Sequence, residues 1–150
     1  MIVAGAVQYS LIAATADDRD WLDQLRRDAY RDLFDATWGG WDEQRHQAHF
    51  AASIAQGNIT IIEHHGRRVG MLQLLDHGEV LEVGEIQIQP VTQRAGLGTV
   101  VLNDVIQRAK ALGQTVRLST GLKNDRALRW YLRLGFSITA TSATHCYLEI

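Results

Sequence analysis

The sequence lacks the residues that mark disulfide-rich, zinc-binding and membrane-spanning proteins. Its 150 residues include one cysteine, Cys146, which cannot form an intramolecular disulfide and belongs to no zinc-ligand spacing. No segment approaches the roughly 18 consecutive apolar residues of a transmembrane helix. Residues 1–7 are apolar, but they carry no basic leader and no long hydrophobic region. These absences favour a reduced, cytoplasmic protein with no bound metal.

An excess of charge of one sign is also missing. The formal net charge is -2, with 15 Lys and Arg against 17 Asp and Glu and no block of like charges. We therefore expect no nucleic-acid partner and no binding to an anionic membrane. With 46% hydrophobic residues and a single proline, the chain is expected to form one domain over residues 1–150 around one sizeable core.

Hydrophobic periodicity predicts an α+β domain. Strands are expected at about residues 9–15, 58–63, 68–75, 80–89, 116–120, 136–141 and 144–150, and helices at about 16–34, 42–56, 97–112 and 126–134. A whole helix separates the fourth strand from the fifth. These two strands are therefore expected to be parallel neighbours joined by a right-handed crossover.

In the fourth strand, the alternation of apolar and polar residues changes phase. Apolar residues alternate at Leu81 and Val83, and then at Ile86 and Ile88 they alternate in the opposite phase. A β-bulge near Gly84 would explain the change. With such a bulge, Glu82 and Glu85 can face the same side of the sheet, and without it they cannot.

A glycine-bearing loop, residues 93–98, joins the fourth strand to the helix that follows. Its two glycines let backbone approach a ligand closely, and the amides of residues 94–99 lie at a helix N-terminus. Unpaired N–H groups and the helix dipole favour an anion such as phosphate there. Neither the nucleotide P-loop nor the dinucleotide fingerprint fits, because no Lys-Ser/Thr follows and Val101 stands at the third glycine position. The alternative is a turn that merely needs glycines.

Two sequence patterns bracket this helix and the strand after it. Residues 88–98, IQPVTQRAGLG, fit apolar-x-Pro-x-x-Gln/Arg-x-x-Gly-x-Gly/Ala, and residues 124–136, NDRALRWYLRLGF, fit Asn-x-x-Ala-x-x-aromatic-Tyr-x-x-x-Gly-Phe. Both resemble motifs of the GNAT superfamily of acyl-CoA-dependent N-acyltransferases. The resemblance implies a mixed, mostly antiparallel twisted sheet of about seven strands with four helices, in which the fourth and fifth strands are parallel and splayed.

The resemblance implies acetyl-CoA as the acyl donor. Its pyrophosphate would bind the amides of the glycine loop, and its pantetheine arm would bind backbone groups near Ile86 to Ile88. Asn124 falls at the polar position beside the cofactor, with ordinary helix N-capping as the alternative. The expected cofactor contacts are Ile86, Gln87, Ile88, Gln93, Arg94, Ala95, Gly96, Leu97, Gly98, Thr99, Asn124 and Tyr131.

The implied reaction is direct acetyl transfer to a primary amine of a small molecule or peptide within a ternary complex. Tyr131 falls on the tyrosine that many members use to protonate the leaving thiolate, with helix packing as the alternative. Either Glu82 or Glu85 would accept the proton of the ammonium, and solvent-facing glutamates are the alternative. Glu82 also matches the base position of the superfamily's histone acetyltransferases. A coenzyme A-binding module without turnover is the competing function, and a longer acyl donor is a third.

Acceptor specificity is expected in residues 16–57 and in the final hairpin. Trp38, Trp41 and Asp42 lie between the first two helices, where aromatic walls and a carboxylate would suit a cationic amine. Tryptophans at such a junction can instead fill the core. His145 on the last strand would help to move protons, with packing or surface exposure as the alternative.

Three other side chains have a structural interpretation. His46 and His49, three residues apart on a helix, are predicted to be solvated rather than metal-binding, since no carboxylate or cysteine pattern accompanies them. Cys146 is predicted to be a small buried hydrophobe. The resemblance to the GNAT superfamily also makes a homodimer compatible with the sequence.

Overall fold

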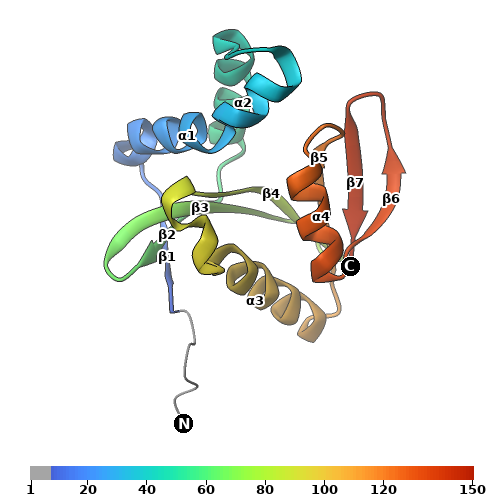
Figure 1. The fold of residues 1–150 in the computed structure, drawn as a ribbon. Coiled ribbons are helices and arrows are strands. Elements are labelled where there is room, and N and C mark those ends of the chain that lie inside the picture. Colours follow the sequence, from blue (N-terminus) through green and yellow to red (C-terminus); the bar gives the residue numbers. More distant parts are fainter. Residues whose placement is uncertain (1–7) are drawn as a thin grey trace.

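The computed structural model describes residues 8–150, and for residues 93–95 it describes the backbone alone (Figure 1). The apolar start at residues 1–7 therefore lies outside the described residues. The strands are β1 Ser10–Ala13, β2 Ile59–His64, β3 Arg67–Asp76, β4 Val80–Ile88, β5 Thr115–Gly121, β6 Ser137–Thr141 and β7 His145–Glu149. The helices are α1 Arg19–Trp38, α2 Glu43–Gln56, α3 Leu97–Ala111 and α4 Asp125–Leu134, with short 3₁₀ turns η1 Ala16–Asp18 and η2 Pro90–Ala95.

The seven strands form one mixed sheet in the order β1-β2-β3-β4-β5-β7-β6. Neighbouring strands pair antiparallel, except that β4 and β5 run parallel on either side of the α3 crossover. The predicted seven strands, four helices and parallel central pair are thereby confirmed. The terminal hairpin joins the sheet through β7 rather than through β6.

The parallel pair separates soon after it forms. Residues 80–82 of β4 pair with residues 115–117 of β5, but β4 continues to Ile88 and β5 to Gly121 without further pairing between them. The predicted splay of these two strands is therefore confirmed. It opens an edge of β4 on the side that leads to η2 and α3.

Helices cover both faces of the sheet (Figure 1). The larger core lies beneath α3, whose apolar side chains recur every three or four residues and are buried: Leu97, Val101, Leu102, Val105, Ile106 and Ala109. Cys146 belongs to this core, which confirms the prediction for it. The smaller core lies between the sheet and the helix pair α1–α2 and consists of Leu22, Leu25, Phe50, Ile61 and Met71.

The predicted bulge in β4 is present. Opposite β3, Gln73 pairs with Glu85 and the next residue, Leu74, pairs with Val83, so Gly84 has no partner across the ladder. An added Cβ at Gly84 would lie 2.7 Å from Oε1 of Gln73. The close approach of a neighbouring side chain is therefore what requires glycine at the bulge.

The bulge decides which way the two glutamates of β4 face. Leu81 before it and Ile86 after it both pack against the larger core under α3. Glu82 and Glu85, which alternate with these residues, therefore lie on the opposite face, where α1 and α2 are. The sequence prediction that a slip would bring them to one side is confirmed.

Two predicted boundaries differ from the structure. The first helix was expected to end near Phe34, but α1 continues to Trp38, whose ring meets that of Phe34 edge to face at 4.8 Å between centroids. Residues 93–98 were expected to be a loop, but residues 90–95 form a 3₁₀ turn that begins at Pro90, and α3 begins at Leu97. Within residues 8–150, no helix combines the length and the apolar composition needed to cross a membrane.

Candidate functional site

The N-terminus of α3 has the features expected of an anion site. Gly96 takes the N-cap position with φ of 76°, a left-handed conformation that side-chain-bearing residues rarely adopt. It supplies no side-chain cap, and nothing lies within 4 Å of the place where its Cβ would be. The first intrahelical bond of α3 runs from the Val100 N–H to the Gly96 carbonyl. The preceding N–H groups of the helix therefore have no intrahelical partner and lie at the positive end of the helix dipole.

Helix α4 is fastened to the first turn of α3. A Cβ on buried Gly98 would lie 3.1 Å from the ring of Trp130, so the indole rests directly on the backbone there. The Trp130 Nε1–H donates a hydrogen bond to Thr99 Oγ1 over 2.9 Å. The same ring stacks on Tyr131, with 5.1 Å between centroids. These contacts connect the anion site to the helix that carries Tyr131.

Asn124 caps the N-terminus of α4. Its Oδ1 accepts a hydrogen bond from the Ala127 N–H over 3.2 Å. The capping alternative raised by the sequence is thus observed. A contact between Asn124 and the cofactor stays a prediction.

Glu85 is a buried carboxylate held by two side chains. It lies on β4 just after the bulge and is 8% exposed. Its Oε1 is hydrogen-bonded to Nε2 of His49 on α2, and its Oε2 accepts a hydrogen bond from Nε2 of Gln87 over 3.2 Å. Nothing in the sequence pattern linked His49 to this glutamate, because the contact joins two elements that are far apart in the chain.

Glu82 lies on the same face of β4 as Glu85 but in different surroundings. Its side chain is 40% exposed, and its Oε1 lies 2.9 Å from Nε2 of His77, in the turn between β3 and β4. Of the two glutamates predicted as bases, Glu85 is therefore the one enclosed by the helices.

Two phenols share the electrostatic environment of Glu85. Burial raises the pKa of Tyr131 above its ordinary value, and the negative charge of Glu85 raises it further. Burial also raises the pKa of Tyr30 on α1, with added contributions from Glu85 and Tyr131. The charge of this carboxylate therefore acts on a phenol from α1 and on a phenol from α4. Tyr30 was missed at the sequence level, where it appeared only as one more position of an amphipathic helix.

A buried guanidinium lies beside these groups. Arg26 of α1 is 6% exposed, and its charged plane lies 4.8 Å from the centre of the Tyr30 ring. Burial lowers the pKa of Arg26, offset in part by Tyr30, Glu85 and Asp23. Its Nη1 donates a hydrogen bond to Nδ1 of His46 over 2.8 Å. Arg26 was also missed, since a long polar residue on a helix is ordinarily solvent-exposed.

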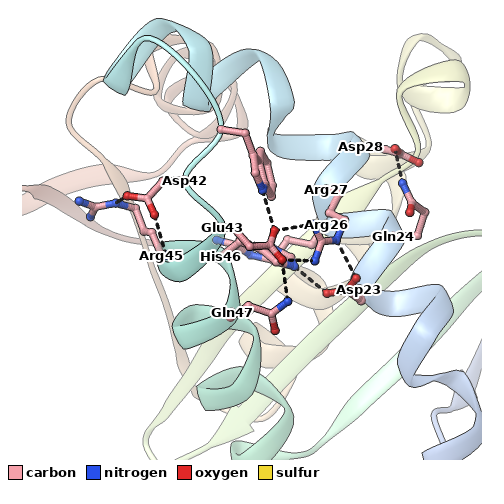
Figure 2. Close-up of polar contacts among 11 residues, drawn as sticks. Asp23, Gln24, Arg26, Arg27, Asp28, Asp42, Glu43, Arg45, His46 and Gln47 are labelled. Carbon is pink, nitrogen blue, oxygen red and sulfur yellow. Dashed lines mark hydrogen bonds and ion pairs between the residues drawn. The ribbon is translucent and has the colours of Figure 1, made fainter.

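The prediction that His46 is solvated is wrong. The side chain is fully buried, and its Nε2 lies 2.6 Å from Oδ1 of Asp23 (Figure 2). Arg26 can only donate, so Nδ1 of His46 accepts and Nε2 carries the proton that is donated to Asp23. Spacing placed His46 and His49 near one face of α2 but could not tell which of them points into the junction with α1.

Within residues 8–150, no three His, Cys, Asp or Glu residues are grouped so that they could hold a metal ion.

The residues proposed for acceptor recognition lie at the junction of α1 and α2. Trp41 stacks on Phe34 at 4.3 Å between ring centroids, and its Nε1–H donates to Glu43. Asp42 caps α2 by accepting a hydrogen bond from the Arg45 N–H over 3.0 Å (Figure 2). These contacts give both residues structural roles, and their contact with an acceptor stays a prediction.

Two other predicted acceptor residues are at the surface. Trp38 is about half exposed, and the Arg45 guanidinium lies 4.2 Å from the centre of its ring. His145 is exposed at the start of β7, opposite Gly121 at the end of β5, and its Nδ1 lies 2.8 Å from Thr144 Oγ1. His145 thus lies at the end of the sheet toward which β4 and β5 diverge, and its role in moving protons stays a prediction.

Most of the chain matches a known protein family. The family described as "Acetyltransferase (GNAT) family" matches residues 20–136. The chain belongs to the GNAT family. An uncharacterized N-acetyltransferase of Methanocaldococcus jannaschii is 29% identical over 85% of this chain. The chain spans 60% of the length of that relative.

Solved structures share the GNAT fold. The PaiA N-acetyltransferase of Thermoplasma acidophilum in complex with coenzyme A has a TM-score of 0.73, 14% identity, and coverage of 95% of this chain and 98% of its own. An acetyltransferase of Thermus thermophilus has a TM-score of 0.74, 14% identity, and coverage of 96% and 97%. The GNAT resemblance read from the two sequence motifs is therefore confirmed.

Proposed function

We propose that this GNAT protein transfers the acetyl group of acetyl-CoA to a primary amine of a small molecule or peptide, by direct attack within a ternary complex. The observation that carries the proposal is Glu85. Its carboxylate is buried at the start of the unpaired part of β4 and raises the pKa of the Tyr131 phenol. Glu85 supports the proposal as a proton acceptor next to the splayed strands, and Tyr131 supports it as a proton donor that feels the charge of Glu85.

The N-terminus of α3 and the unpaired part of β4, which together we call the cradle, fit coenzyme A. The open space at Gly96 and the N–H groups of residues 97–99 suit a pyrophosphate, since both hydrogen bonds and the helix dipole favour an anion. Beyond Glu82, β4 no longer pairs with β5, and we propose that backbone groups of Ile86 and Gln87 along this edge bind the pantetheine arm. Bound acetyl-CoA supplies the activated thioester carbonyl.

We assign proton removal to Glu85. An amine attacks only after its ammonium form has lost a proton, and a carboxylate beside the acceptor can take it. Glu85 is enclosed by α1 and α2 and lies near Tyr131, whereas the half-exposed Glu82 points to a surface turn. A buried carboxylate interacts more strongly with an incoming ammonium than an exposed one, because water screens it less.

We assign proton return to Tyr131. Burial and the charge of Glu85 raise the pKa of its phenol, so the hydroxyl keeps its proton at neutral pH. It therefore enters the reaction as a donor for the leaving sulfur atom. Stacking against Trp130 orients the Tyr131 ring with respect to the first turn of α3.

Calorimetric titration with acetyl-CoA, followed by thiol release against a panel of primary amines, tests the proposal. We expect binding and amine-dependent release. The Gly96→Glu variant, which puts a side chain and a negative charge at the proposed pyrophosphate site, should lose binding while its thermal unfolding stays cooperative. Retained binding in Gly96→Glu would contradict the assignment of the pyrophosphate site to the N-terminus of α3. Binding of acetyl-CoA by the native chain without turnover of any amine would favour a coenzyme A-binding module instead.

A further inference from the structure

The buried carboxylate of Glu85 is connected to the protein surface through one side chain. His49 contacts Glu85 Oε1 with its Nε2, yet 49% of the histidine side chain is exposed. Helix α2 supplies this histidine, whereas β4 supplies the glutamate. His49 therefore reaches from the outer side of α2 to the group that we assign as the base.

The neighbours of Glu85 each contribute a different interaction. Gln87 donates to Oε2. From α1, Arg26 contributes positive charge, but its Nη1 is bonded to His46, and Tyr30 contributes a phenol. Tyr131 from α4 contributes a second phenol. The hydrogen bond to Oε1 thus comes from His49.

A hydrogen bond of this kind has two consequences for a buried carboxylate. It offsets the free-energy cost of removing the charge from water, and it favours the ionised form over the protonated form. It also fixes the direction of the carboxyl group, because both oxygens of Glu85 are then held, one by His49 and one by Gln87. A base must be ionised and correctly directed before an ammonium arrives.

We propose that His49 is a positioning residue for acetyl transfer, whose Nε2–H donates to Glu85 Oε1 and holds this carboxylate ionised and directed toward the acceptor amine. The inference rests on the proposed function and deepens it. Under this proposal, α2 takes part in proton removal as well as in covering the sheet.

Three single variants test the role of His49. His49→Phe removes the N–H donor, His49→Gln keeps a neutral donor, and His77→Phe is the matched control on the exposed histidine–glutamate pair of the same strand. For His49→Phe we expect kcat to fall by about tenfold, as when one partner of a hydrogen bond to a buried charged group is lost. The KM for acetyl-CoA should stay within about twofold. His49→Gln should recover most of kcat, and His77→Phe should match the native chain.

The pH dependence of kcat provides a readout that a purely structural role would not change. Without the donor, the ionised form of Glu85 is less favoured, so the acid limb of the profile should move to higher pH in His49→Phe. In His49→Gln the limb should return toward its native position. A uniform loss of kcat at every pH, with the limb unmoved in both variants, would overturn the proposal. If His49→Phe fails to fold, His49→Ala, which also removes the N–H donor, takes its place with the same expected results.

Glu85→Gln separates this inference from the proposed function. If Glu85→Gln lowers turnover by about a hundredfold or more and His49→Phe behaves like His77→Phe, the role of His49 is wrong while the base assignment stands. If Glu85→Gln keeps native turnover, the base assignment itself is wrong. Adding His49→Phe to Glu85→Gln should cause no further loss, because the histidine acts through the carboxylate. An additional loss of tenfold or so in the double variant would contradict that coupling.

Discussion

Strand β4 carries two glutamates on one face, and each is paired with a histidine. The two pairs differ in their burial and in where the histidine comes from. In one, Glu85 is buried and its partner His49 comes from α2. In the other, Glu82 and His77 are both about half exposed, five residues apart in the chain. Water screens the exposed pair, so its interaction is worth little. Enclosure by helices, rather than residue type, distinguishes a carboxylate suited to proton transfer from one that is part of the surface.

Replacing the two glutamates tests the comparison most strongly. Glu85→Gln is expected to lower kcat by between about a hundredfold and ten-thousandfold, the contribution typical of a general base. Glu82→Gln should change kcat by less than about twofold, since a screened surface carboxylate contributes little. Steady-state thiol release measures both, and calorimetry with acetyl-CoA checks that binding persists. Comparable losses in the two variants would remove the distinction between the pairs.

Tyr131→Phe tests the proton donor that accompanies only the buried pair. We expect kcat to fall by about tenfold to a hundredfold, because water can return the proton to sulfur less efficiently than an oriented phenol. Affinity for acetyl-CoA should stay close to native, since Trp130 still holds α4 against α3. Tyr147→Phe, at an exposed position on β7, is the control. Unchanged turnover in Tyr131→Phe would exclude Tyr131 as the acid.

Gly84→Ala tests the bulge that brings both glutamates to one face. The added methyl would lie 2.7 Å from Gln73 Oε1, and this amide is held by hydrogen bonds to the carbonyls of Ser53 and Gly57. We expect a loss of about 1–3 kcal/mol in the free energy of unfolding, as for an overpacked core. A several-fold fall in kcat should accompany it as Glu85 shifts against His49.

Urea unfolding and thiol release measure the two effects of Gly84→Ala. Gly40→Ala is the matched control, because an added Cβ there meets nothing within 4 Å. Native stability in Gly84→Ala would mean that the Gln73 amide can move aside at no cost. In that case the bulge would not depend on glycine.

The smallest effect is expected at Asp23, whose carboxylate is hydrogen-bonded to the buried His46. Burial alone raises the pKa of Asp23, but hydrogen bonds from Arg27 and His46 outweigh it and hold the pKa below its ordinary value. A depressed pKa in the folded state stabilises the protein at neutral pH, and this contribution is lost as the pH falls through the folded-state pKa.

Asp23→Asn should therefore lower the free energy of unfolding by up to about 1 kcal/mol at neutral pH, a small value because Asp23 is partly screened by solvent. The difference from the native chain should shrink in acid. Thermal unfolding at several pH values measures it, with Asp28→Asn on the exposed side of α1 as the control. A difference that stays constant or grows in acid would contradict the sign of the effect.

Local patterns were enough to predict much of the fold and part of the site. The change of phase around Gly84 predicted the bulge, and the two motifs predicted the parallel β4–β5 pair with its splay. Boundaries were less accurate, because the end of α1 at Trp38 depends on packing against Phe34. His46 was misread because helical spacing does not specify which side of a helix another helix will cover.

What the sequence by itself determined is the chain's membership of the GNAT family and the backbone features of the proposed cofactor site. Glycines, a proline and alternating apolar residues act through local sterics and periodicity, which can be read without knowing what lies nearby. Tertiary structure alone decided which glutamate is buried, and it brought His49 to Glu85 across 36 positions of the chain. Burial and hydrogen bonding between distant elements depend on how helices pack on the sheet, so no local pattern encodes them.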